Sequence, residues 1–114
     1  SEPLQLSTDR ANAYVTAILE GEEGIVARAP KGQRQFTILG SARTLGRLVG
    51  GREVDEDTAR GVLLEAATVH IGVEGMTREE VERTIDRGIA YGKQAPRTIE
   101  RRSHERGRGN GDRM

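Results

Sequence analysis

The sequence predicts an all-α fold, a compact bundle of about four helices with a disordered, arginine-rich C-terminal tail. Apolar residues recur at helical spacing in four segments that are separated by Gly and Pro. No segment alternates apolar and polar residues over the length of a strand. The 114 residues include only one Phe, two Tyr and no Trp, so the core must be built from Leu, Ile, Val and Ala. Small aliphatic side chains suit helix-on-helix packing.

The first two helices are expected on either side of a Pro-Lys-Gly turn at residues 30–32. The first spans residues 8–28 and the second residues 33–49, each with an apolar face of helical period. These faces consist of Ala11, Tyr14, Val15, Ile18, Leu19, Ile25 and Val26 in the first helix and Phe36, Leu39, Ala42, Leu45, Leu48 and Val49 in the second. Gly40 and Gly46 lie inside the second helix, where they predict a close helix crossing or access of a ligand to the backbone.

The third and fourth helices are each expected to begin at a residue that favours helix starts. Asp55 begins the third, which continues through Ile71 and ends near Gly72. Thr77 and Glu80 form a T-x-x-E capping box for the fourth, which ends at Gly92. The fourth helix also carries small residues that are expected to lie at a close helix contact, Thr84 or Gly88.

The charge is distributed unevenly, although the net charge is zero. Residues 1–96 hold 12 Lys and Arg against 15 Asp and Glu, a net charge of −3, and residues 97–114 have a net charge of +3. Past Ile99 the tail has no apolar residue except Met114, so it cannot bury enough surface to order itself. We expect a flexible N-terminus at residues 1–7, a helical bundle at 8–97 and a disordered basic tail at 98–114. Because the chain begins at Ser1 without a Met, we interpret it as a piece of a longer protein or as carrying a tag remnant.

The sequence lacks the residues that several kinds of functional site require. The chain has no Cys, which excludes disulfides, thiolate metal sites and Cys nucleophiles. His70 and His104 have no companions at metal-ligand spacing, and there is no glycine-rich phosphate loop. The sequence therefore assigns no catalytic residue, no metal site and no cofactor, and it leaves open whether the protein is an enzyme. It contains no apolar run of membrane-spanning length and no signal peptide, so we expect a cytoplasmic protein without a membrane partner.

A first set of candidate phosphate contacts begins at the Pro-Lys-Gly turn. Lys31 and Arg34 stand where unpaired N–H groups open the second helix, which favours an anion. Arg43 and Arg47 are four residues apart and share one side of that helix. Together the four predict a basic stripe of the kind that contacts a phosphate backbone. The alternative is a solvated helix face with ordinary ion pairs.

A second set lies on the fourth helix. Arg83, Arg87 and Tyr91 follow one another at intervals of four residues, an arrangement that offers two phosphate contacts and one stacking ring to a single strand. The alternative is that Glu79 or Glu82 pairs with Arg83 within the helix and that Tyr91 covers the end of the bundle.

Three short segments in this order resemble a known family. They are APKGQR at residues 29–34, LGRLV at 45–49 and RTIDRGIAYG at 83–92. Over residues 10–97 the chain is similar to the helical accessory region downstream of the catalytic domain in bifunctional DNA primase-polymerases of the archaeo-eukaryotic type, from actinobacterial phages and plasmids. Gln35 stands where that family usually has Asn.

The resemblance implies a non-catalytic domain that contacts single-stranded template DNA, nucleotide phosphates or both, with a primase catalytic domain or a helicase as its partner. An alternative is a protein-interaction module that self-associates or docks on a helicase or polymerase. In that case small residues would pack across the interface, namely Gly40, Gly46, Gly88 and Gly92. A helix-turn-helix regulator is a third interpretation, although no helix carries the cluster of Asn, Gln, Ser and Arg that reads bases.

Overall fold

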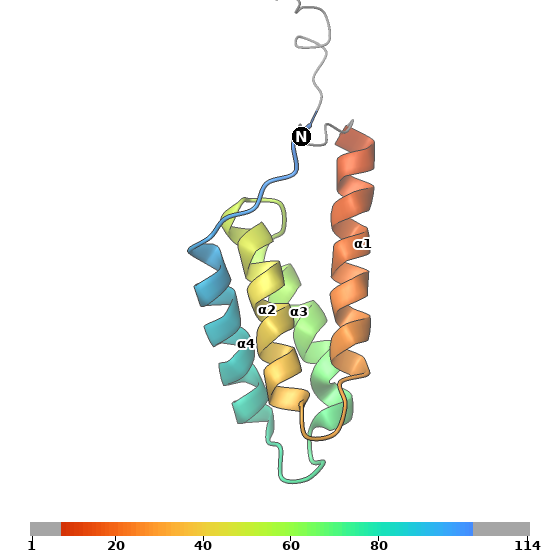
Figure 1. The fold of residues 1–114 in the computed structure, drawn as a ribbon, viewed down its shortest axis with the longest axis vertical. Coiled ribbons are helices and arrows are strands. Elements are labelled where there is room, and N and C mark those ends of the chain that lie inside the picture. Colours follow the sequence, from red (N-terminus) through yellow and green to blue (C-terminus); the bar gives the residue numbers. More distant parts are fainter. Residues whose placement is uncertain (1–7, 102–114) are drawn as a thin grey trace, which may run out of the picture.

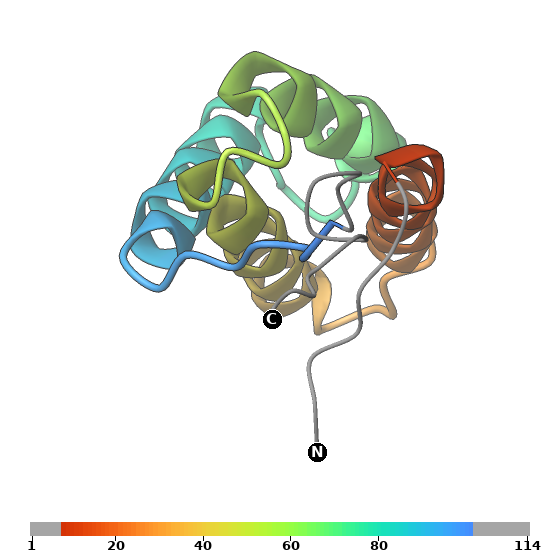
Figure 2. The same ribbon diagram turned by 90° about the horizontal axis from the view of Figure 1, so that it is seen from above.

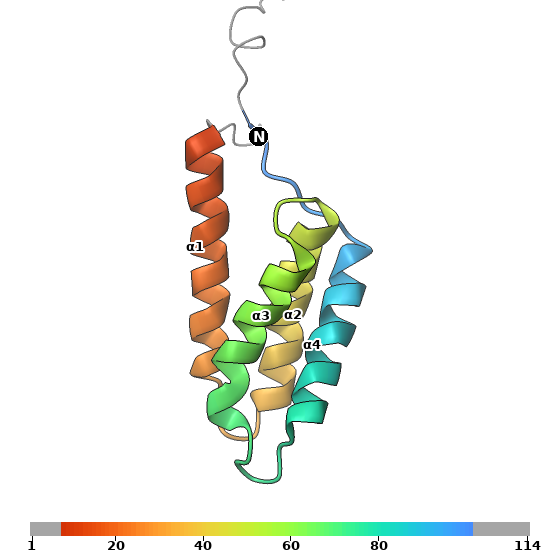
Figure 3. The same ribbon diagram turned by 180° about the vertical axis from the view of Figure 1, so that it is seen from behind.

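The computed structural model describes residues 8–101, which form an up-and-down bundle of four α-helices (Figure 1). These are α1 (Thr8–Ala27), α2 (Arg34–Gly50), α3 (Glu56–Ala67) and α4 (Arg78–Lys93), with a 3-10 turn η1 (Thr68–His70) after α3. Successive helices run in opposite directions, so α2 runs parallel to α4 and α1 runs parallel to α3 (Figures 1 and 3). The predicted all-α fold is confirmed, and none of the elements between residues 8 and 101 is a strand.

The helix ends follow local chemistry. The capping box of α4 is present as predicted, because the Glu80 N–H donates to Thr77 Oγ1 at 3.1 Å and the Thr77 N–H donates to Glu80 Oε1 at 3.0 Å. The predicted end of the third helix near Gly72 is too late, since α3 ends at Ala67 and only the 3-10 turn η1 continues to His70. There the Thr68 hydroxyl donates to the carbonyl of Glu65 at 2.6 Å, and the chain tightens into η1.

The core is aliphatic, as the composition predicts. Its largest fully buried side chains are Ile38, Leu45, Leu48, Leu63, Ile85, Ile89, Val26 and Val81. Three aromatic and aliphatic residues expected in the core are instead exposed, namely Tyr14, Ile25 and Phe36. Phe36 and Ile38 are two residues apart and therefore point to opposite sides of α2. Ile38 is the one that faces the core, so the assignment of Phe36 to the apolar face is wrong.

The most extensive helix contact joins the parallel helices α2 and α4. Their backbones approach closely. A Cβ at Gly46 would lie 2.8 Å from the Ile89 Cα, and a Cβ at Gly92 would lie 2.8 Å from the backbone nitrogen of Arg47. The predicted close crossing is therefore found at Gly46. Gly40, by contrast, has no atom within 4 Å of where a Cβ would stand. Gly88 also packs inside this contact, against Leu39.

Residues 94–101, which we call the C-terminal strap, cross the end of α2 toward α1 (Figure 2). The Arg97 N–H donates to the carbonyl of Arg47 at 2.8 Å, and Ile99 is buried. The buried carboxylate of Glu53 accepts from the Ile99 N–H at 2.8 Å and from Arg101 Nη1 at 2.9 Å. The described chain thus packs beyond the expected domain limit at residue 97. The rest of the expected tail and the expected flexible segment 1–7 lie outside the described residues.

Candidate nucleic-acid interface

The parallel contact of α2 with α4 brings the two predicted sets of candidate residues onto one side of the bundle. Because Gly92 packs against α2, the neighbouring Tyr91 is carried to the edge of the contact, beside Arg43. The Arg43 guanidinium lies 4.7 Å from the centroid of the Tyr91 ring, within the range of a cation–π contact. Tyr91 is 56% exposed, so its ring is open to solvent rather than closing the end of the bundle.

Arg47 is held next to this pair by the C-terminal strap. Its Nε donates to the carbonyl of Ala95 at 2.7 Å, which orients the guanidinium along the edge of α4. Arg43, Arg47 and Tyr91 line a surface hollow of about 300 Å³. Gly92, Gln94 and Ala95 complete its lining. A cationic hollow with an aromatic wall has the chemistry needed for a phosphate and a base.

Arg83 and Arg87 extend the same side along α4, about two turns and one turn before Tyr91, respectively. Both are exposed, and the alternative considered for Arg83, an ion pair with Glu79 or Glu82, is not formed. Neither arginine makes an ion pair within residues 8–101. We use the term basic face for the surface made of Arg43, Arg47, Arg83, Arg87 and Tyr91.

Three of the four carboxylates of α4 have partners outside the basic face, and the fourth, Glu79, lies four residues before Arg83 without pairing with it. Helix α2 contains no Asp or Glu in its 17 residues. On α4, Asp86 accepts from Arg60 of α3 at 2.7 Å, and Glu82 accepts from Arg78 at 3.0 Å. Glu80 is engaged in the capping box. Apart from Glu79, the carboxylates of these two helices therefore do not neutralise the positive charge of the basic face.

Lys31 and Arg34 lie apart from the basic face. Arg34 is nine residues before Arg43, which places the two on opposite sides of α2 at about 100° per residue. Both basic residues of the turn bind Glu74 instead, with Lys31 Nζ at 3.2 Å and Arg34 Nη1 at 2.9 Å from its carboxylate. The continuous stripe expected from Lys31 to Arg47 does not form, because the helix rotates Arg34 toward η1.

Arg34 also belongs to a buried hydrogen-bond chain. Its Nε donates to His70 Nδ1 at 3.1 Å, and His70 Nε2 lies 2.7 Å from the carbonyl of Val26. A guanidinium is only a donor, so Nδ1 accepts and Nε2 carries the proton donated to Val26. The arginine side chain is only 18% exposed. We therefore interpret Arg34 as tying together α1, α2 and η1.

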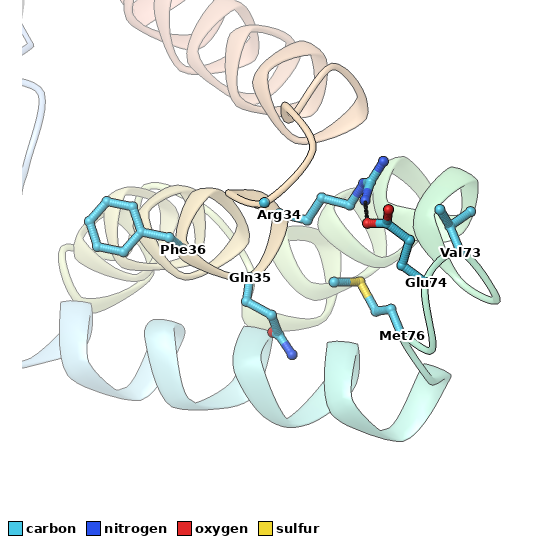
Figure 4. A pocket seen from close by; sticks show the side chains of 7 residues that line it. Arg34, Gln35, Phe36, Val73, Glu74 and Met76 are labelled. Carbon is cyan, nitrogen blue, oxygen red and sulfur yellow. Dashed lines mark hydrogen bonds and ion pairs between the residues drawn. The ribbon is translucent and has the colours of Figure 1, made fainter.

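A second hollow, of about 330 Å³, lies at the start of α2 beside this ion pair. Its lining comprises Gly32, Arg34, Gln35, Phe36, Val73, Glu74 and Met76. In Figure 4 Arg34 and Glu74 face each other, whereas Gln35 points toward α4 and Phe36 points away on the opposite side of the helix. The Gln35 amide oxygen accepts from the Thr84 hydroxyl at 2.6 Å, which fixes the level at which the two helices meet.

Sequence reasoning missed that Phe36 shares a side of α2 with the basic face. Positions 36, 40, 43 and 47 are separated by four, three and four residues, the spacing of one helix side. That spacing is present in the sequence, but Phe36 also fits the three-residue spacing of Leu39 and Ala42, which predicts it on the apolar face.

No protein-family model, curated protein or solved structure matches this chain. Among residues 8–101, no three His, Asp or Glu side chains are grouped as a metal site requires. The helices of this part of the chain include none with the length and apolar character needed to cross a membrane.

Proposed function

We propose that this chain is a non-catalytic helical accessory domain of a replicative primase-polymerase that holds single-stranded DNA by its phosphate backbone. The observation that carries the proposal is the convergence of Arg43, Arg47 and Tyr91 at the edge of the α2–α4 contact. Arg83 and Arg87 continue that surface. A single strand is favoured over a duplex because a ring such as Tyr91 stacks only on an unpaired base.

The same surface suits the phosphates of a nucleotide. The hollow beside Tyr91 is about 300 Å³, at the lower end of the size range of small-molecule sites. A primase catalytic domain or a helicase is the partner that this proposal requires, since the basic face positions a strand and supplies no reacting group. Competition by a deoxynucleoside triphosphate against a bound oligonucleotide would show whether both ligands use this surface.

The alternative, a protein-interaction module, receives less support from the glycines. Gly46, Gly88 and Gly92 pack inside the α2–α4 contact and are not available to a second protein. Of the four glycines considered for an interface, only Gly40 is exposed.

Fluorescence anisotropy with a labelled oligodeoxythymidylate tests the proposal. If four phosphates are contacted, the logarithm of the affinity should fall with the logarithm of the salt concentration with a slope of about −3, which is about a 50-fold loss between 50 and 200 mM salt. Replacing Arg43 and Arg87 by Gln should make this slope shallower by about 1.4. Arg78→Gln is the matched control, because Arg78 lies on α4 but is paired with Glu82. Equal binding by the double variant and the control would refute the proposal, as would an absence of binding at low salt.

A further inference from the structure

Phe36 is the most exposed of the large hydrophobic side chains described, at 77%. It lies in the first turn of α2, on the side opposite Ile38, so the fold gains almost nothing from its apolar ring. The neighbouring residue Gln35 makes the contact with α4. The ring is therefore available to a ligand, and its surroundings indicate which kind.

Phe36 borders the hollow that includes Val73, Glu74 and Met76, but along its own side of α2 the residues that follow it are small or basic. On the same side of α2, the following positions are Gly40, Arg43 and Arg47. Gly40 has nothing within 4 Å of where a Cβ would stand, so a strand can approach the backbone between the ring and the first arginine. A protein-docking patch would need contiguous apolar surface, which this line of residues lacks. An aromatic ring in line with arginines and without carboxylates on its helix matches a single-stranded nucleic acid.

The parallel packing of the two helices sets the distance between Phe36 and Tyr91. Two contacts show which residues of α2 and α4 lie at the same height along the helix axes. Thr84 is level with Gln35, to which it donates a hydrogen bond, and Tyr91 is level with Arg43, with which it makes a cation–π contact. Phe36 and Arg43 are seven residues apart, which is about 10 Å along the helix axis. The rise between stacked bases is about 3.4 Å, so about 10 Å corresponds to three rises.

We propose that Phe36 is a second base-stacking platform at the far end of the basic face. A strand of about four nucleotides then lies along the α2–α4 edge, with its end bases on Phe36 and Tyr91. Its phosphates pass over Arg43 and Arg87 between the two rings. This inference rests on the proposed function and adds to it the direction in which the strand lies and the shortest strand that fills the site.

The first experiment uses the absence of Trp from the chain. Phe36→Trp places a single indole at the proposed platform, and its emission should be quenched by an oligodeoxythymidylate of eight residues at 50 mM salt. Val69→Trp is the matched control, because Val69 is 60% exposed and lies in η1, outside the basic face. Quenching in the Phe36 variant alone supports the platform. Equal quenching, or none, in both variants while the labelled strand still binds overturns it.

The second experiment measures affinity by anisotropy. Phe36→Ala should weaken binding about 5- to 150-fold, the range that corresponds to loss of one base stack, whereas Phe36→Tyr should bind as the unaltered chain does. The affinity of the unaltered chain should rise steeply from two to four nucleotides and then level off. If Phe36→Ala binds normally while the Arg43 and Arg87 variants do not, the platform is wrong and the proposed function stands. If nothing binds and Phe36→Ala abolishes a dimer seen by light scattering, both proposals fail and a second copy of the chain is the ligand.

Discussion

Two Gly→Ala substitutions in α2 should change stability in opposite directions. At Gly46 the added methyl group would lie 2.8 Å from the Ile89 Cα and 2.9 Å from its carbonyl carbon. At Gly40 it would meet no atom within 4 Å. The two positions are in the same helix and six residues apart, so the comparison isolates the contact with α4 from the effect of alanine on the helix itself.

The magnitudes follow from two opposing terms. Alanine is favoured over glycine in a helix interior by about 1 kcal/mol, and this gain applies at both sites. Carbon atoms in contact prefer about 3.5–4 Å, so at Gly46 the backbones must separate by roughly 1 Å. Overpacking of this kind costs about 1–3 kcal/mol, and more where backbone rather than a side chain must move. We expect Gly40→Ala to raise the free energy of unfolding by about 0.5–1 kcal/mol and Gly46→Ala to lower it by about 1–2 kcal/mol.

Thermal unfolding followed by circular dichroism measures both variants. For a domain of this size, 1 kcal/mol shifts Tm by about 4–8 °C, so Gly40→Ala should melt about 3–6 °C higher and Gly46→Ala about 5–15 °C lower than the unaltered chain. An increase of similar size in both variants would refute the close α2–α4 contact, and with it the geometry that joins Arg43 to Tyr91.

Two further predictions concern the ion pairs. Arg101 holds the pKa of the Glu53 carboxyl below its ordinary value, chiefly by its hydrogen bond. The resulting stability is present above the ordinary carboxyl pKa of about 4 and is lost as the pH falls through the folded-state pKa. Glu53→Gln should therefore cost about 1–2 kcal/mol at pH 7, with the difference from the unaltered chain vanishing in acid denaturation. A constant difference at all pH values would contradict this. Arg34→Met leaves His70 Nδ1 without its donor and should cost about 1–3 kcal/mol of stability, while affinity for single-stranded DNA changes less than threefold. A tenfold loss of affinity in the folded variant would place Arg34 in the binding site.

The parts of the fold that were predictable depend on neighbours along the chain. The capping box of Thr77 and Glu80 spans three residues, and the turn at residues 30–32 contains its own Pro and Gly. Helix starts and stops of this kind are set by interactions within about one turn. The end of α3 was misplaced because the hydroxyl of Thr68 competes for a backbone carbonyl, a choice that residue type alone does not decide.

The candidate site was predictable only in pieces. The spacing of Arg43 and Arg47, and that of Arg87 and Tyr91, predicts that each pair shares one side of its own helix. Their meeting across the two helices was not visible in the sequence, because it depends on which glycines face each other. Phe36 was misassigned for the same reason, since the choice between core and surface depends on where the partner helices lie.

By itself the sequence determined the helical class, the approximate helix limits and the aliphatic core, all of which arise from periodicity and local capping. Only the tertiary structure decided the partners of individual side chains. Arg34 binds His70 and Glu74, which are 36 and 40 residues away along the sequence. It therefore does not take part in the predicted phosphate site. Arg43 meets Tyr91 because glycine contacts bring α2 and α4 together in parallel. Such long-range pairings depend on helix packing and rotation, which residue types in one segment do not specify.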